Sequence, residues 1–208
     1  QLLGIDLGTT NTKAIAFDEH GNLLSMATRR TPTSVEGNLR ATYDAESIWQ
    51  TVALTIREAL DGLGGPPAID GVAMSSMAEA VVGVDTAGLP VAPVIAWFDD
   101  RTIPQRDWWR DHLGAREVFK ICGLHLDYIF SINKVMWMRE HAPDVFQRAV
   151  RWLGISDYVG YRLTGQQATS PSIASRTMAF DVAKRDWSER MLELAELPRE
   201  LFPPVIES

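Results

Sequence analysis

The sequence has few of the residues that form disulfides or bind transition metals. Cys122 is the only cysteine among 208 residues, which excludes an internal disulfide framework and indicates a reducing, cytoplasmic compartment. Histidine is also scarce, and its four positions lie too far apart for a His-x-x-x-His or Cys/His zinc pattern. They are His20, His112, His125 and His141. We therefore expect no zinc site.

Long apolar runs and surplus positive charge are lacking as well. No apolar segment approaches the roughly 20 residues that a membrane span needs, so we expect no membrane partner. The 20 Lys and Arg are outnumbered by 27 Asp and Glu, which argues against a broad cationic face and hence against a nucleic-acid partner. Apolar residues at 46% and charged residues at 23% are typical of a globular protein.

The residue patterns predict an α/β fold. Extended segments broken by turns indicate a three-stranded meander in the first thirty residues, and an apolar stripe predicts a helix between Asp44 and Gly64. Further strands are expected over 69–75 and 80–84, with an extended segment at 91–97. From residue 103 onward the pattern becomes helical. The helices are expected over 104–112, 131–141, 143–150 and 155–163.

Residues 4–13 combine side chains that are suited to phosphates. The carboxylate of Asp6 ends a buried strand and can hold Mg²⁺ through its waters. A glycine then permits a tight reversal, and hydroxyl, amide and ammonium groups follow that can cradle a polyphosphate together with backbone N–H groups. These candidates for cofactor binding are Gly8, Thr9, Thr10, Asn11 and Lys13. The alternative is an ordinary β-hairpin whose polar residues serve the turn, and the sequence has no Walker A motif.

Asp6-Leu7-Gly8-Thr9-Thr10, followed by two more strands, resembles the phosphate-binding hairpin of the actin, Hsp70 and sugar kinase superfamily. Later segments in the same order are similar to the FGGY carbohydrate kinases, which include glycerol, xylulose and gluconate kinases. These segments are 130–131, 134–138, 172–181, Trp187 and 197–203. The resemblance covers almost the whole chain and implies an α/β, ribonuclease H-like N-terminal domain with a helical insertion.

The resemblance also implies an activity, namely the ATP- and Mg²⁺-dependent transfer of the γ-phosphoryl group to a hydroxyl of a sugar or polyol, such as a pentulose or sugar acid. It places Asp6 at the metal and the reacting phosphate, and the other hairpin candidates at the ATP phosphates. The catalytic base, an Asp of a second nucleotide-binding domain, is expected beyond Ser208. We therefore expect residues 1–208 to be the substrate-binding half of a two-domain kinase and to be inactive alone. Within it we expect a core sheet and helix in 1–102 and a mainly helical lobe, incomplete at its C-terminal end, in 103–208.

Residues 77–79 stand where family members place the polar groups that read the sugar. Of Met77, Ala78 and Glu79, only Glu79 is polar, and a carboxylate can accept hydrogen bonds from two vicinal hydroxyls. Glycerol kinases carry an Arg at the position of Ala78, so the resemblance argues against glycerol as the acceptor. The alternative for Glu79 is a solvated loop carboxylate.

Residues 97–102 are in register with the family's Trp-x-x-x-Arg-Thr segment and supply two more substrate candidates. The ring of Trp97 can pack against the C–H side of a sugar, and Asp99 can bind its hydroxyls. The alternative is a core tryptophan with Asp99 as a turn residue and Arg101 as its salt-bridge partner.

One departure from the family pattern concerns Ile129, which stands where glycerol kinases place a substrate-contacting Tyr; Tyr128 is one position away, which again argues against glycerol. Arg176 is expected to pair with a buried carboxylate, and Lys134 and Trp137 to serve in packing.

The alternative function is a catalytically silent sugar-sensing or scaffolding protein, and a chaperone or filament relative is disfavoured because chaperones lack the later segments. A small-molecule sugar or polyol is the expected partner, and a homodimer is left open as the assembly.

Overall fold

The computed structural model describes residues 1–35 and 39–207, and the contacts within it divide the chain into two compact units. Unit 1 consists of residues 1–33 and 44–77, and unit 2 of the described residues within 34–43 and 78–208. The expected division of the protein at residue 102 stays a prediction.

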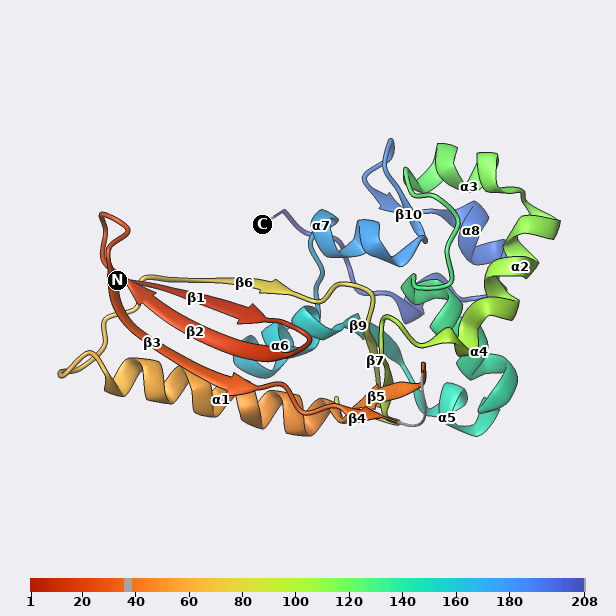
Figure 1. The fold of residues 1–208 in the computed structure, drawn as a ribbon. Coiled ribbons are helices and arrows are strands. Elements are labelled where there is room, and N and C mark those ends of the chain that lie inside the picture. The colour runs from red at the N-terminus through yellow and green to blue at the C-terminus, as the bar shows by residue number, and fades with distance from the viewer. Residues whose placement is uncertain (36–38, 208) are drawn as a thin grey trace. The chain divides into compact units, whose positions relative to one another are not determined.

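Unit 1 contains a four-stranded sheet and one long helix (Figure 1). Strands β1 (Leu2–Leu7), β2 (Asn11–Phe17) and β3 (Leu23–Arg30) form the antiparallel meander that the sequence predicts. Strand β6 (Gly71–Ser76) pairs with β1 in parallel, which gives the strand order β3-β2-β1-β6. The parallel pair requires a long crossover connection, and helix α1 (Ala45–Asp61) lies in it.

Helix α1 packs against β2 and β3, and its first turn is capped by Asp44. The Asp44 carboxylate accepts a 2.7 Å hydrogen bond from the backbone N–H of Ser47, as an N-cap residue does. Alternate residues of β1 and β2 are buried because successive side chains of a strand point to opposite faces. Asp6 and Lys13 each stand between two buried residues and are cross-strand partners, so both side chains lie on the other face of the hairpin.

Unit 2 holds small sheets and short helices. Its strands are β4 (Ser34–Val35), β5 (Ala41–Tyr43) and β8 (Val94–Ile95) in one sheet, β7 (Val81–Val84) with β9 (Arg151–Gly154) in a second, and β10 (Phe180–Asp181) with β11 (Asp186–Trp187) in a third. Its helices are α2 (Ile103–His112), α3 (Ala115–Cys122), α4 (Ser131–His141), α5 (Pro143–Arg148), α6 (Ile155–Thr164), α7 (Pro171–Ala174) and α8 (Glu189–Leu194). Three single turns of 3₁₀-helix lie at Asp100–Thr102, Ser175–Thr177 and Arg199–Leu201.

Aromatic and sulfur-containing side chains form much of the core of unit 2. Trp109 on α2 and Phe130 at the start of α4 are fully buried, and Met178 and Met191 join them in one apolar cluster. Large rings bury much apolar area and methionine fills irregular gaps, so a unit built from short elements still obtains a continuous core.

The predicted α/β class is confirmed. The predicted boundaries of the longer helices agree more closely with the structure than those of the short elements. The helix expected over 131–141 coincides with α4, whereas the extended segment expected at 91–97 forms a paired strand only at β8. Helices α3, α7 and α8 and strands β4, β5, β9, β10 and β11 were not predicted. Each has eight residues or fewer, which is too short for the apolar period to be read.

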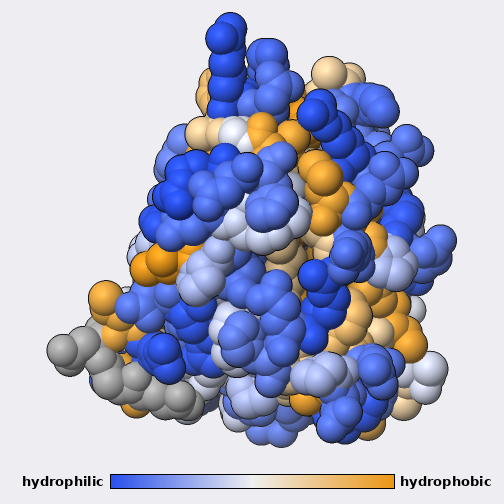
Figure 2. Space-filling view, turned by 90° about the vertical axis from the view of Figure 1, so that its right-hand side faces the viewer, coloured by the Kyte–Doolittle hydropathy of each residue, from blue (hydrophilic) through white to orange (hydrophobic). Residues whose placement is uncertain are grey.

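The surface drawn in Figure 2 is mainly hydrophilic, and the hydrophobic residues on that face appear as patches separated by polar ones. Among the helices of residues 1–35 and 39–207, none has the length and apolar character that crossing a membrane requires.

Candidate functional site

The β1–β2 hairpin of unit 1 brings the predicted phosphate-binding residues together. Asp6 lies directly across from Lys13, and the Lys13 ammonium is 3.6 Å from the Asp6 carboxylate. Both side chains are more than two-fifths exposed, so their attraction is weakened by water and contributes little to stability. Because this ion pair contributes little to stability, the Asp6 carboxylate and the Lys13 ammonium are available to contact a ligand.

In the turn of this hairpin, residues 8–11, the carbonyl groups of Gly8, Thr10 and Asn11 accept hydrogen bonds from within the protein. The Gly8 N–H donates to the Asn11 carbonyl at 3.0 Å, and a Cβ atom at Gly8 would lie only 2.9 Å from that same oxygen, so the turn requires glycine here. Thr31, just beyond β3, occupies two further carbonyls, those of Gly8 and Thr10. Sequence reasoning missed Thr31. Counting the meander register would have found it, because Asn11 pairs with Arg30 and the next residue faces the turn.

The backbone N–H groups at the tip of the turn are free to act as donors. In the part of the chain that the structure describes, the N–H groups of Thr9 and Thr10 donate to no other residue, and both residues are exposed. Successive unoccupied N–H groups beside threonine hydroxyls form an anion-binding concavity. The hairpin therefore has the donors that a polyphosphate needs.

The carboxylate of Asp6 fits a Mg²⁺ ion that is shared with phosphate. The described residues contain no group of three or more His, Cys, Asp or Glu that could hold a metal ion by themselves. Magnesium is commonly bound by one or two carboxylates, with water and substrate phosphates as its other ligands. One half-exposed carboxylate next to a turn that is predicted to bind phosphate is a donor set of this kind.

Glu79, the predicted sugar-binding carboxylate, is held by Arg176 of unit 2. The Arg176 Nε donates to Glu79 Oε1 at 2.8 Å, and Nη2 donates to the same oxygen. The Arg176 guanidinium also lies over the ring of Phe130, 5.3 Å from its centroid. The Glu79 side chain is only 12% exposed, so it is not the solvated loop carboxylate considered as its alternative. Its second oxygen, Oε2, has no hydrogen-bond partner among the described residues.

The other predicted substrate residues have different surroundings. Met77 belongs to unit 1, where it is buried and its N–H donates to the Leu7 carbonyl at 3.0 Å. Ala78 and Trp97, in unit 2, are half-buried, and the Trp97 ring meets that of Phe98 edge to face at 5.5 Å. The roles of these residues in binding a substrate stay predictions.

Asp99 has the contacts of a structural turn residue. Its carboxylate is fully buried and accepts hydrogen bonds of 2.8 to 3.0 Å from the Ala41 N–H and from the Arg101 backbone and guanidinium. Burial acts to raise the pKa of Asp99, but these hydrogen bonds outweigh it and hold the pKa below its ordinary value. The pairing with Arg101 is the alternative that the sequence left open, and it leaves no exposed part of the carboxylate for a sugar.

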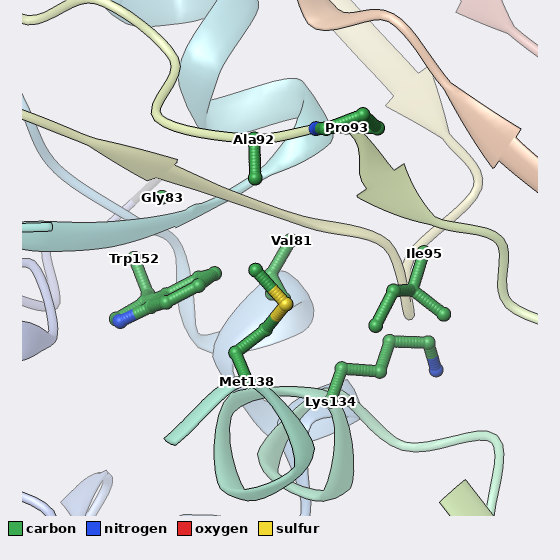
Figure 3. A pocket seen from close by; sticks show the side chains of 8 residues that line it. All are labelled: Val81, Gly83, Ala92, Pro93, Ile95, Lys134, Met138 and Trp152. Atoms are coloured by element: carbon green, nitrogen blue, oxygen red, sulfur yellow. The ribbon is translucent and has the colours of Figure 1, made fainter. Parts of the chain in front are cut away.

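Lys134 on α4 is buried, and its ammonium group donates a hydrogen bond to the Ile129 carbonyl. In Figure 3 its aliphatic stem runs beside a cavity that Met138 and Trp152 also line. The cavity has room for about one water molecule, so it does not hold a sugar. Lys134 thus fixes the end of the loop that contains Tyr128 and Ile129.

Burial lowers the pKa of Lys134 to about 7, although nearby Glu79, Asp99 and Asp127 act to raise it. The unfolded chain keeps this proton up to the ordinary pKa of 10.5, whereas the folded chain loses it above about 7. Between these values the unfolded state binds more protons, so the folded state becomes more stable as the pH rises.

Lys134→Met is expected to flatten the pH dependence of stability between pH 7 and 9. For the two pKa values above, Lys134 raises the free energy of unfolding by roughly 2 kcal/mol over this window, and the variant should lack that rise. Urea unfolding at pH 7, 8 and 9 measures the difference. Lys120→Met, which removes a half-exposed lysine paired with Glu117, is the control and should keep the wild-type slope. Equal slopes for Lys134→Met and wild type would contradict the lowered pKa.

Comparison with known proteins identifies the family of this chain. Residues 1–208 match the family described as "FGGY family of carbohydrate kinases, N-terminal domain". The chain belongs to the FGGY family. The glycerol kinase of Methylibium petroleiphilum is 34% identical over 215 residues, covering 100% of this chain and 43% of that protein. The xylulose kinase of Lactococcus lactis subsp. lactis is 32% identical over 216 residues, covering 100% of this chain and 41% of that protein.

A solved FGGY relative has the same fold. The glycerol kinase of Plasmodium falciparum, determined with ADP, matches with a TM-score of 0.92 at 21% identity, over 98% of this chain and 42% of that protein. Together with the family match, this likeness confirms the expected fold of an FGGY N-terminal domain. The chain spans about two-fifths of the length of the curated FGGY relatives named above.

Proposed function

We propose that the protein carrying this chain transfers the γ-phosphoryl group of ATP to a hydroxyl of a sugar or polyol. The observation that carries the proposal is the hairpin of unit 1, in which the Asp6 carboxylate and Lys13 ammonium flank a turn whose Thr9 and Thr10 N–H groups donate to none of the described residues. Membership of the FGGY family supports it, as does the ADP in the glycerol kinase of Plasmodium falciparum.

Unit 1 is proposed to hold the phosphates. The N–H and hydroxyl groups of Thr9 and Thr10 would donate to phosphate oxygens, and Lys13 would add a single-point charge contact. Asp6 would hold Mg²⁺, which when bound neutralises charge on the transferring phosphoryl group. Because Asp6 must stay anionic for that role, we assign the removal of the acceptor's proton to a group other than Asp6.

Unit 2 is proposed to bind the acceptor through Glu79 and Trp97. The free Oε2 of Glu79 would accept a hydrogen bond from a sugar hydroxyl, and the ring of Trp97 would pack against the C–H face. Relatives of nearly equal identity are named for glycerol and for xylulose, so identity does not select the acceptor. We favour a larger polyol, pentulose or sugar acid over glycerol because Ala78 offers no polar group beside Glu79.

A panel of pentuloses, polyols including glycerol, and gluconate tests this proposal. Each would be incubated with ATP and Mg²⁺ and the full protein that carries this chain, and sugar phosphate would be detected by mass spectrometry. ATP-dependent formation of at least one sugar phosphate is expected. Sugar binding by calorimetry without any product would instead support the silent sugar-sensing protein.

A further inference from the structure

Thr31 contacts the turn between β1 and β2, which is proposed to bind phosphate, through its side chain and through its backbone N–H. Its hydroxyl is 2.7 Å from the Gly8 carbonyl oxygen, and its backbone N–H donates to the Thr10 carbonyl at 3.0 Å. Thr31 is 6% exposed, so it cannot itself reach a bound nucleotide. We propose that Thr31 is a positioning residue for ATP binding, acting through the orientation of the turn between β1 and β2. This inference rests on the proposed function.

The hydrogen bonds of Thr31 form a chain with one direction. A threonine hydroxyl has a single proton, and the Gly8 carbonyl can only accept, so the Thr31 hydroxyl donates to Gly8. The Thr12 hydroxyl, 3.1 Å from that of Thr31 and 1% exposed, must then donate to Thr31. Hydrogen bonds linked in this way polarise one another, so the bond to Gly8 is strengthened by Thr12.

The direction of these hydrogen bonds determines which backbone groups of the turn can contact an anion. A peptide group points its carbonyl and its N–H in opposite directions, so holding the Gly8 carbonyl inward directs the N–H of the next residue, Thr9, outward. The N–H of Gly8 is bound to the Asn11 carbonyl and the Thr10 carbonyl is held by the Thr31 N–H, so the carbonyls of Gly8, Thr10 and Asn11 are all occupied. Carbonyl oxygens in those places would repel phosphate.

The main-chain bond from Thr31 to Thr10 does not involve the side chain and is retained in valine and serine variants, so only the hydroxyl needs to be tested. Thr31→Val keeps the shape and β-branching and removes the donor to Gly8. Thr31→Ser keeps the donor and is the conservative rescue. Thr55→Val is the matched control, since Thr55 is a fully buried threonine of unit 1 whose hydroxyl donates to the Thr51 carbonyl on α1 at 2.6 Å, remote in sequence from the turn.

The experiment measures ATP affinity directly, by calorimetry without acceptor, in the full protein and its three variants. Thr31→Val is expected to weaken ATP binding about tenfold, the usual effect of one lost buried hydrogen bond, while KM for the acceptor stays within twofold. Thr31→Ser should bind ATP as wild type does, and Thr55→Val should leave ATP affinity unchanged even where it lowers the unfolding midpoint. This pattern separates positioning from general destabilisation.

Two results would overturn the inference. One is an ATP affinity of Thr31→Val equal to that of Thr55→Val, and the other is a loss in Thr31→Val that raises KM for ATP and for the acceptor alike. If Thr31→Val fails to fold, Thr12→Val replaces it, because it removes the donor to Thr31 and is expected to weaken ATP binding by a smaller factor; unchanged affinity in that variant would reject the proposal. A wild-type protein that neither binds ATP nor forms sugar phosphate would reject the proposed function itself.

Discussion

Asn in place of Asp6 is expected to lower kcat for sugar phosphorylation by at least about 10³-fold while leaving the binding of the acceptor nearly unchanged. The side chain keeps its size, but the negative charge beside Lys13 and the phosphate-binding turn is lost. A metal ion stabilises a transferring phosphoryl group by several kcal/mol, and each ~1.4 kcal/mol is a factor of ten in rate. The acceptor contacts proposed for unit 2 are not altered by the substitution.

The low stability contribution of the Asp6–Lys13 pair makes this variant informative. Both groups are more than two-fifths exposed and 3.6 Å apart, so breaking their ion pair should change the free energy of unfolding by less than about 1 kcal/mol. Glu58→Gln is the matched control, because Glu58 is a half-exposed carboxylate of the same unit with a cationic partner, Arg29, at 2.7 Å. Steady-state kinetics of both variants decide the matter, and a near-normal kcat for Asp6→Asn would remove this residue from the metal and phosphate site.

Substitutions of Glu79 and Arg176 are expected to be strongly non-additive. Glu79→Gln should raise KM for the best acceptor by about 10- to 100-fold, since hydrogen bonds to a charged group contribute about 1.5–3 kcal/mol. Arg176→Met should raise KM as well, because it releases the carboxylate whose Oε1 it holds. In Glu79→Gln/Arg176→Met, the loss of the arginine should add little to the effect of Glu79→Gln, because Arg176 acts through Glu79.

The kinetics of the single and double variants form a double-mutant cycle. Arg199→Met is its control, since Arg199 also lies over an aromatic ring, that of Trp187 at 5.8 Å, and pairs with a carboxylate, Asp186 at 3.2 Å. That variant should keep the wild-type KM. Independent, additive effects of the Glu79 and Arg176 substitutions would show that Arg176 acts by another route, and an unchanged KM for Glu79→Gln would return Glu79 to a structural role.

The sequence alone determined the hairpin and the composition of its turn. A strand period of two, a glycine at the reversal and the order of Asp6, Thr9, Thr10 and Lys13 are local features, and local hydrogen bonding between adjacent strands brings them together. Helix α1 was predictable from local sequence as well, since its apolar residues recur at helical spacing over several turns within one segment.

Only the tertiary structure decided which polar groups are occupied. Glu79 and Arg176 are 97 positions apart, and no local pattern shows that one carboxylate oxygen is held while the other has no partner among the described residues. Asp99 is paired with Arg101 and accepts a hydrogen bond from the Ala41 N–H, 58 positions away, because the pairing of β5 with β8 brings Ala41 close to it. A buried polar group must find a hydrogen-bond partner, and packing rather than sequence distance determines which partner is near.

The burial of Lys134 and the position of Thr31 have the same origin. A lysine on a helix is ordinarily a surface residue, and only the packing of α4 into the core of unit 2 makes its ammonium group depend on the Ile129 carbonyl. Thr31 stands 23 residues after Gly8, and the register of β2 against β3 carries its hydroxyl to the back of the turn. The sequence thus determined which chemical groups the proposed phosphate-binding hairpin contains. The orientation of those groups depends on contacts between residues distant in the chain, which exist only once the sheet and the core have formed.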